Sequence, residues 1–488
     1  MRKQSLYSPM RSSAFLMLGA VLLTVLLASS ATSSQAQPYK GKQTYSWYTT
    51  PNGEVTPGAD WERILNNPQL VYSDYLPYPV TDENPYSIPE LTPAPKGYKP
   101  FYISHYGRHG SRWLISTRYY TAPVAMLEKA KEAGQLTELG LSLLERFKIS
   151  NEAALSRYGE LTPLGHQQHR EIAGRMFKNF PEVFKGDAQV DARSTVIIRC
   201  ILSMDSFCQR LKELNPKLQI TNDASYFDMA YMNYQDPEGY FRAIKNDKEA
   251  GNTLADFSNK VMKPERFVAT ILKDPKWLEE YNLNKDSVKN FQKLTPTQFF
   301  YYTAQQVINL PNTPLTIKLD DLLTLEELYQ VYVTRNADSY FYAGWDNLSK
   351  NVLPYSQTNL LRNILETAKK HIAEEKGGAT LRFGHDSNLL PLCALMNIDG
   401  AGVHVDNIEE IADNWAMYWY IPKAGNLQFI FYKGKKKNDS ILLKVLLNEH
   451  EAVLPVPTDN FPYYKWDDFL AFYENILKDS PANNLRPR

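Results

Sequence analysis

The fold of this chain is decided by the stretch Lys99-Pro100-Phe101-Tyr102-Ile103-Ser104-His105-Tyr106-Gly107-Arg108-His109-Gly110-Ser111-Arg112. Its first half, through His105, has the apolar and aromatic residues of a buried strand, and Gly107 and Gly110 end that strand in a tight loop. Ligands of parallel α/β sheets bind beyond the carboxyl ends of the strands. We therefore expect His109 to lie at the rim of a sheet.

A second segment of the same kind follows much later in the chain. Residues Ala379 to Phe383 read as a strand, Gly384-His385-Asp386 ends it, and a helix is expected from Ser387 onward. Helical patterns lie between the two segments, including one that opens at Thr162-Pro163, with Thr162 as its N-cap. Strands alternating with helices predict an α/β fold, and they place His109 and His385 at the same rim of a mainly parallel sheet.

The chain divides into four parts by pattern. Residues 1–36 are a signal peptide, and residues 37–95 are an irregular extension that wraps the core. Residues 96–204 and 375–488 form the α/β core, with helices on both faces of the sheet. Residues 205–374 are polar and helical with few strand-like runs, and we expect them to form an inserted helical domain.

The first 36 residues predict export. Arg2, Lys3 and Arg11 precede an apolar run from Ala14 to Ala28, and small residues then lead to a cleavage site after Ala36. The apolar run is shorter than the roughly 20 residues that a spanning helix needs. Later segments are not apolar enough to span a bilayer, so we expect a periplasmic or secreted protein without a membrane span.

Charge and cysteine content narrow the possible partners. The 54 basic and 54 acidic residues cancel, so no global basic field exists to collect nucleic acid, and a local cluster of cations must hold any anionic ligand. The three cysteines are Cys200, Cys208 and Cys393, and the first two lie about 12 Å apart on an expected helix. Because that is too far for a disulfide, we expect buried, free thiols.

The residues around His109 suit a phosphoryl group. Arg108 and Arg112 flank the imidazole, and guanidinium groups match phosphate oxygens bidentately while keeping their charge. These cations also disfavour protonation of the ring, which leaves a nitrogen free to attack phosphorus. At the second segment, Asp386 follows His385 directly, and a carboxyl beside a bound phosphate can keep its proton and donate it to a leaving group. Taken alone, the position of Asp386 favours a simpler interpretation, as a helix N-cap or its neighbour.

Four ordered motifs resemble those of the histidine acid phosphatase family. Arg108 to Arg112 is similar to its R-H-G-x-R signature, and Leu161-Thr162-Pro163-Leu164-Gly165 to its L-T-x-x-G element. The segment Asp191 to Thr195 resembles the part that bears a third phosphate-binding arginine, and His385-Asp386 resembles the later H-D motif. The resemblance covers roughly residues 96–205 and 375–450.

This resemblance implies a role for each residue. His109 forms a phosphohistidine, and Asp386 is the proton donor. The non-bridging phosphate oxygens are held by Arg108, Arg112, Arg193 and His385. No metal and no other cofactor is implied, because the arginines supply the positive charge.

The substrate is less sharply defined. Leu114 stands where the family signature usually has a proline, and Arg118 is a candidate substrate contact without matching spacing. The stretch from Ser104 to Arg112 looks most like bacterial relatives of multiple inositol polyphosphate phosphatases, which usually carry H-A-E at the second site. The H-D form is shared with phytases and with broad-specificity acid phosphatases. Both substrate classes, inositol polyphosphates and general phosphate monoesters, therefore stay open.

Other classes of protein fit the same residues less well. A cysteine phosphatase needs arginine six positions after its cysteine, where this chain has Ser206, Leu214 and Asp399. His166 and His169 at i, i+3 lack further metal ligands nearby. A catalytically idle protein that binds a phosphate ligand has no use for the proton donor Asp386, and a mutase fits neither export nor the H-D motif.

Overall fold

The computed structural model describes residues 59–79, 88–232, 239–283, 293–436 and 438–484. All of them belong to one compact unit, residues 38–488. The predicted signal peptide, residues 1–36, lies outside the described residues. Of the expected extension, residues 37–95, the structure describes α1 (Ala59–Asn66), the 3-10 segment η1 (Pro68–Tyr75) and the chain around them.

An eight-stranded sheet forms the core of the unit. Its strand order is β3-β2-β4-β1-β5-β6-β7, with β8 also paired to β6. The strands are β1 (Lys99–Arg108), β2 (Gln189–Ser194), β3 (Gln219–Asp223), β4 (Gly378–Gly384), β5 (Asn426–Lys433), β6 (Leu442–Leu447), β7 (His450–Glu451) and β8 (Tyr463–Lys465). Strands β3, β2, β4 and β1 run parallel, and β5 adds to β1 in the antiparallel direction.

Side chains of β1 alternate between the two faces of the sheet, as the period of a strand requires. Ile103 packs with Leu381 of β4 and Phe207 in one apolar cluster, whereas Tyr102 and Tyr106 join a second cluster on the other face. Both faces are therefore buried, which explains why the strand is apolar almost throughout.

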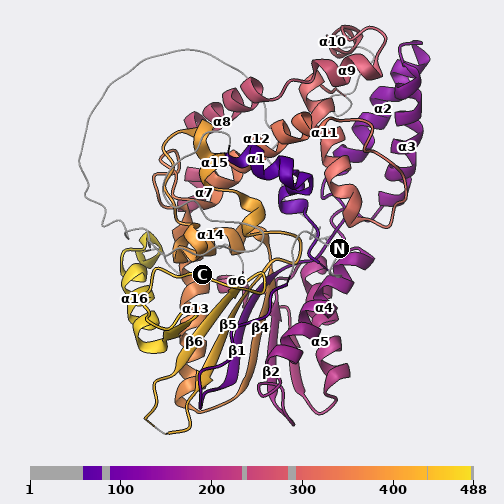
Figure 1. The fold of residues 1–488 in the computed structure, drawn as a ribbon. Helices are drawn as coiled ribbons and strands as arrows, with labels where there is room; N and C mark the ends of the chain where they lie inside the picture. Colours follow the sequence, from indigo (N-terminus) through magenta and orange to yellow (C-terminus); the bar gives the residue numbers. More distant parts are fainter. Residues whose placement is uncertain (1–58, 80–87, 233–238, 284–292, 437, 485–488) are drawn as a thin grey trace, which may run out of the picture. The chain divides into compact units, whose positions relative to one another are not determined.

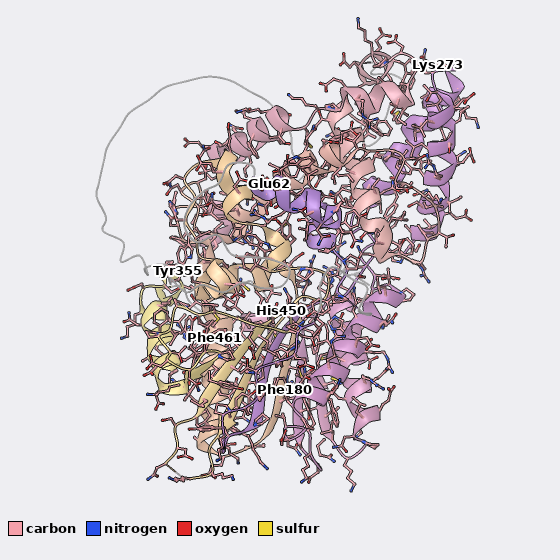
Figure 2. The ribbon with its side chains drawn as sticks, viewed as in Figure 1. Glu62, Phe180, Lys273, Tyr355, His450 and Phe461 are labelled. Atoms are coloured by element: carbon pink, nitrogen blue, oxygen red, sulfur yellow. The ribbon has the colours of Figure 1, made fainter. Side chains whose placement is uncertain are left out.

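Helices cover both faces (Figure 1). Helices α4 (Pro163–Asn179) and α5 (Ile198–Leu214) lie on one side, and α13 (Thr358–Ala373) and α16 (Trp466–Lys478) on the other. Thr162 caps α4 by accepting a hydrogen bond from the backbone N–H of Gly165, and Pro163 is its first residue, as predicted. Phe180, which ends α4, lies beside the strands (Figure 2).

A separate apolar cluster holds a group of helices together. It joins α2 (Arg118–Glu132) and α3 (Glu138–Ala154) to α9 (Glu265–Ile271) and α11 (Pro296–Asn309). Lys273, just after α9, lies among these helices, away from the strands (Figure 2). The other helices are α6 (Met229–Met232), α7 (Tyr240–Lys245), α8 (Lys248–Val261), α10 (Trp277–Leu283), α12 (Leu325–Ala343), α14 (Asp386–Met396) and α15 (Ile411–Asn414).

The predicted α/β fold, with a parallel sheet and helices on both faces, is confirmed. Two details of the sequence analysis were wrong. The region 205–374 contributes a sheet strand, β3, and a covering helix, α13. The helix expected to begin at Ser194 or Thr195 begins at Ile198, because β2 runs through Ser194. The division into core and insertion stays a prediction; the apolar cluster favours grouping α2 and α3 with the inserted helices.

The three cysteines, Cys200, Cys208 and Cys393, are buried and free, as expected. Among the helices that the structure describes, none is both long and apolar enough to cross a bilayer.

Candidate active site

Three loops begin at one rim of the sheet. Arg108 at the end of β1 pairs in register with Gly384 at the end of β4, and the next residue, His109, donates its backbone N–H to the Gly384 carbonyl at 2.9 Å. Beside them, the backbone N–H of Thr195 donates to the Phe383 carbonyl at 3.0 Å, directly after β2. The parallel register thus brings the two histidine segments together, as the sequence predicted.

The L-T-x-x-G element locks the His109 loop in place. A Cβ on Gly110 would lie 2.6 Å from the Gly165 carbonyl oxygen, and one on Gly165 would lie 2.3 Å from the Ser111 carbonyl oxygen. Thr162 donates both its backbone N–H and its hydroxyl to that Ser111 carbonyl, at 2.9 and 3.1 Å. Two backbones meet here at a distance that only glycine permits.

The imidazole of His109 is held as one tautomer. Its Nδ1 lies 2.9 Å from the carbonyl oxygen of Gly110, and because a carbonyl only accepts, Nδ1 carries the proton. Burial, together with Arg199, Arg108 and Arg112, holds the pKa of His109 well below its ordinary value of 6.5. The ring is therefore neutral, and Nε2 is left with a lone pair.

His385 lies next to His109, with 5.8 Å between the ring centroids. The Thr195 hydroxyl lies 3.2 Å from its Nε2, and the Cys200 sulfur lies 3.7 Å from the same nitrogen. Burial and Arg199 lower the pKa of His385 to about 4. This histidine is also neutral over most of the pH range.

Asp386 is the first residue of α14, and its side chain reaches Arg108. Oδ2 lies 2.5 Å from Nη2 of Arg108, while Oδ1 accepts the backbone N–H of Ser387 at 2.8 Å. Burial alone would raise the pKa of Asp386, but Arg108, Lys423 and Arg112 outweigh it and hold the pKa well below its ordinary range. Its side chain keeps 30% of its exposure, so this carboxylate borders the open part of the site.

The arginine that joins this cluster from α5 is Arg199. Its charge is among the causes that lower the pKa of both His109 and His385, and it also acts on Arg112. The signal in the sequence was weak, because Arg199 stands five residues after the strand end at Ser194, within the first turn of α5.

Arg193 does not join the cluster, which corrects the sequence prediction. Its guanidinium pairs with Asp191 at 2.9 Å and with Asp223 at 2.9 Å, and Asp228 lies at 3.8 Å. The physical reason is its position within β2, where it pairs in register with Asp223 of the edge strand β3. Acidic residues of the sheet edge hold the side chain there.

Two further charged residues of the site were missed by the sequence analysis. Asp74, in η1, contacts Arg108 through its carboxylate at 3.3 Å and through its backbone carbonyl at 2.6 Å. Lys423 is fully buried, with Nζ 3.9 Å from Asp74 and 3.9 Å from the centre of the Tyr75 ring. Both stand in irregular segments, where no periodicity points to a common location.

Leu114 and Arg118 are both tied to neighbouring structure. Leu114 is fully buried, and its backbone N–H donates to the Tyr120 hydroxyl at 2.9 Å. Arg118 donates to the Lys293 carbonyl at 2.9 Å and lies over the Tyr302 ring. A contact between Arg118 and substrate stays a prediction.

The fold and the site define an α/β enzyme with a neutral histidine among arginines at a sheet rim. The model of the histidine phosphatase superfamily (branch 2) matches residues 108–448. The chain belongs to this superfamily, and it is a phosphatase. Among curated protein sequences, none matches the chain.

Solved structures share the fold at low identity. The multiple inositol polyphosphate phosphatase of Bifidobacterium longum in complex with phosphate is 18% identical, with a TM-score of 0.69, over 85% of this chain and 99% of that one. The phytase from D. castellii is 14% identical, with a TM-score of 0.58, over 84% of this chain and 86% of that one. These likenesses show a common architecture that includes the helical part.

Proposed function

We propose that the protein is an exported phosphomonoesterase that hydrolyses inositol polyphosphates through a phosphohistidine formed on His109. The observation that carries the chemistry is the His109 ring, which is neutral, has Nδ1 tied to the Gly110 carbonyl and leaves Nε2 free among three arginines. A nucleophile needs such a lone pair at the reacting pH.

In the first step Nε2 of His109 attacks phosphorus, and the bond to the leaving oxygen breaks. Arg108, Arg112 and Arg199 hold the non-bridging oxygens, with His385 as a further donor. Their charge is worth most in the transition state, where negative charge builds on those oxygens. Burial of Arg108, His109, Arg112 and His385 limits how far water screens these charges.

Asp386 protonates the leaving oxygen. In the free enzyme its carboxylate is paired with Arg108, so the entering phosphoryl group must take over that guanidinium. The negative charge of the bound group then favours the protonated carboxyl. In the second step the Asp386 carboxylate removes a proton from water, which attacks the phosphohistidine and releases inorganic phosphate.

The balance of charge around His109 supports a polyanionic substrate. Arg108, Arg112 and Arg199 are joined by Arg335 of α12, which pairs with Asp74. Lys423 also lies here, but burial, Arg108 and Arg112 hold its pKa well below its ordinary value, so it is not counted among the fixed cations. Asp74 and Asp386 act on these cations, and Asp338 acts on Arg335, although burial raises the pKa of Asp338 to about 7. The name of the Bifidobacterium longum enzyme, a multiple inositol polyphosphate phosphatase, is consistent with the same substrate class.

Phosphate release from inositol hexakisphosphate, beside glycerol 2-phosphate and p-nitrophenyl phosphate, tests the substrate. A preference of kcat/KM for inositol hexakisphosphate supports the proposal, and a flat profile makes the protein a general acid phosphatase. His109→Ala should lower turnover of every ester by more than about 1,000-fold. His166→Ala is the matched control, because His166 lies half-exposed on α4 with its ring against Ser206.

Export is supported by the pattern of residues 1–36. The mass of the mature protein recovered from its native host tests it. Cleavage after Ala36 supports export, whereas a full-length intracellular chain contradicts it.

A further inference from the structure

Arg108 is shared between two carboxylates, those of Asp386 and Asp74. Its Nη2 lies 2.5 Å from Asp386 and 3.3 Å from Asp74, while Nη1 donates to the carbonyls of Asp74 and Ile421 at 2.6 and 2.5 Å. The guanidinium is fully buried. Such a charge is strongly destabilising once it loses its partner.

The two carboxylates cannot play the same part in the reaction. Asp386 must carry a proton when the leaving group departs, and a protonated carboxyl is a poor partner for a guanidinium. Asp74 is paired with two guanidiniums, those of Arg108 and Arg335, and it also lies 3.9 Å from Nζ of Lys423. Burial would raise the pKa of Asp74, but Arg335, Lys423 and Arg108 outweigh it and lower the pKa.

We propose that Asp74 is a positioning residue, which keeps Arg108 in place for the phosphoryl group after Asp386 has released it. This inference rests on the proposed function, because it assigns a part in the same reaction to a residue outside the catalytic set. Asp74 acts through Arg108 and does not itself contact substrate.

The local structure around Asp74 fits that role. The preceding residue, Ser73, is fully buried and has φ 60° and ψ −125°, a strained backbone for a residue other than glycine. The next two residues are fastened as well: the Tyr75 carbonyl accepts from Asn312 at 2.7 Å, and the Leu76 carbonyl accepts the backbone N–H of Lys423 at 2.9 Å. The segment is thus fixed from both the helical part and the loop before β5.

Asp74 also lies outside the part of the chain that the family model matches, residues 108–448. The segment that carries it, η1, therefore supplies the enzyme core with a counter-ion from before the first motif. Through Arg335 the same carboxylate links Arg108 to α12.

Asp74→Asn tests the proposal, because it removes the charge and keeps the shape. We expect kcat/KM for glycerol 2-phosphate to fall by about 10- to 100-fold, with weaker inhibition by inorganic phosphate. We also expect the alkaline limb of kcat to move to lower pH. The cations that act on Asp386 are Arg108, Arg112 and Arg199, and Lys423 and the neutral His385 also face it. Losing the negative charge of Asp74 leaves these cations less compensated, which lowers the pKa of Asp386.

Asp60→Asn is the matched control. Asp60 is a fully buried carboxylate of the same N-terminal region, but it pairs with Arg63 and with the Tyr418 hydroxyl. Its loss can lower stability, whereas the pH limb should stay in place. A limb that moves equally in both variants, or in neither, would overturn the role of Asp74.

Should Asp74→Asn lack a cooperative melting transition, Asp74→Glu carries the test. It keeps the charge and displaces the carboxylate by one methylene, so inorganic phosphate should bind more weakly; unchanged inhibition by phosphate overturns the proposal. A wild-type enzyme that neither turns over glycerol 2-phosphate nor binds phosphate would instead contradict the proposed function itself.

Discussion

At the scale of single residues, the site depends on which charged groups reach the His109 ring. Five of the six predicted residues meet there because they stand at the ends of β1 and β4 or in the loops that follow, and the sequence pattern implies the parallel register of these strands. Arg193 stands inside β2 and is held by the acidic residues of the sheet edge. Its place is taken by Arg199, whose position depends on where α5 begins.

The different positions of Arg199 and Arg193 predict different effects of alanine substitution on kcat. Arg199→Ala should lower kcat by about 10²- to 10³-fold, because it removes a half-buried cation that faces the phosphoryl oxygens in the transition state. Arg193→Ala should stay within a few-fold of the wild type, since its partially exposed ion pairs contribute little. Steady-state kinetics with p-nitrophenyl phosphate measures both. A larger loss in Arg193→Ala would restore the arginine that the sequence favoured.

The role of Asp386 predicts a dependence on the leaving group. Asp386→Asn removes the transferable proton, so turnover of glycerol 2-phosphate should fall by about 10²- to 10⁴-fold. The p-nitrophenolate ion leaves without protonation, and its ester should be slowed far less. Equal slowing of the two esters would mean that Asp386 acts only as the partner of Arg108.

Asp74 and Lys423 could not be predicted from the sequence, and the reason is the same for both. Asp74 lies in a 3-10 segment with a strained neighbour, and Lys423 lies in an irregular loop before β5. Strands and helices can be predicted from the period of their apolar residues. The position of an irregular segment depends instead on particular tertiary contacts, which have no such pattern in the sequence. The backbone N–H of Lys423, for example, donates to Leu76, far away in sequence.

At the scale of elements, the loop after β1 depends on its contact with the start of α4. The sequence predicted the cap at Thr162 correctly, but it could not show that Gly165 meets the Ser111 carbonyl. The L-T-x-x-G element therefore has two structural roles. Thr162 begins the helix, and Gly165 lets the His109 loop lie against it.

Gly165→Ala should disrupt the contact with the His109 loop while leaving the Thr162 cap in place. The added Cβ would lie 2.3 Å from a backbone oxygen, which no change of rotamer can relieve, so we expect a loss of about 1–3 kcal/mol in the free energy of unfolding and a lower kcat. Gly174→Ala on the same helix is the control. Its Cβ meets only an ordinary contact 3.7 Å from Arg210, and alanine should stabilise the helix by up to about 1 kcal/mol. Urea unfolding measures both, and equal stability of the two variants would contradict the close contact.

At the scale of the whole molecule, the fold keeps several histidines neutral. His105 and His169 lie in the apolar layer between the sheet and helices α4 and α5, and burial lowers the pKa of each to about 3. Burial and Arg199 lower that of His385 to about 4. The unfolded chain binds protons at these sites near pH 6.5, so it gains protons before the folded protein does as the pH falls.

Stability should therefore be fully present above about pH 6.5 and decline as the pH falls toward 4, by up to about 1.4 kcal/mol per pH unit for each such histidine. Activity should rise as the pH falls, because Asp386 must be protonated in the substrate complex. The loss of stability at low pH therefore sets the lower limit of the pH range in which the enzyme works. His169→Met removes one titrating ring from a fully buried site, where the imidazole packs against Phe383. Denaturant unfolding at several pH values should show a slope reduced by one histidine between pH 6 and 4. An unchanged slope would mean that His169 is already charged in the folded protein, and that the acid limit is set by other groups.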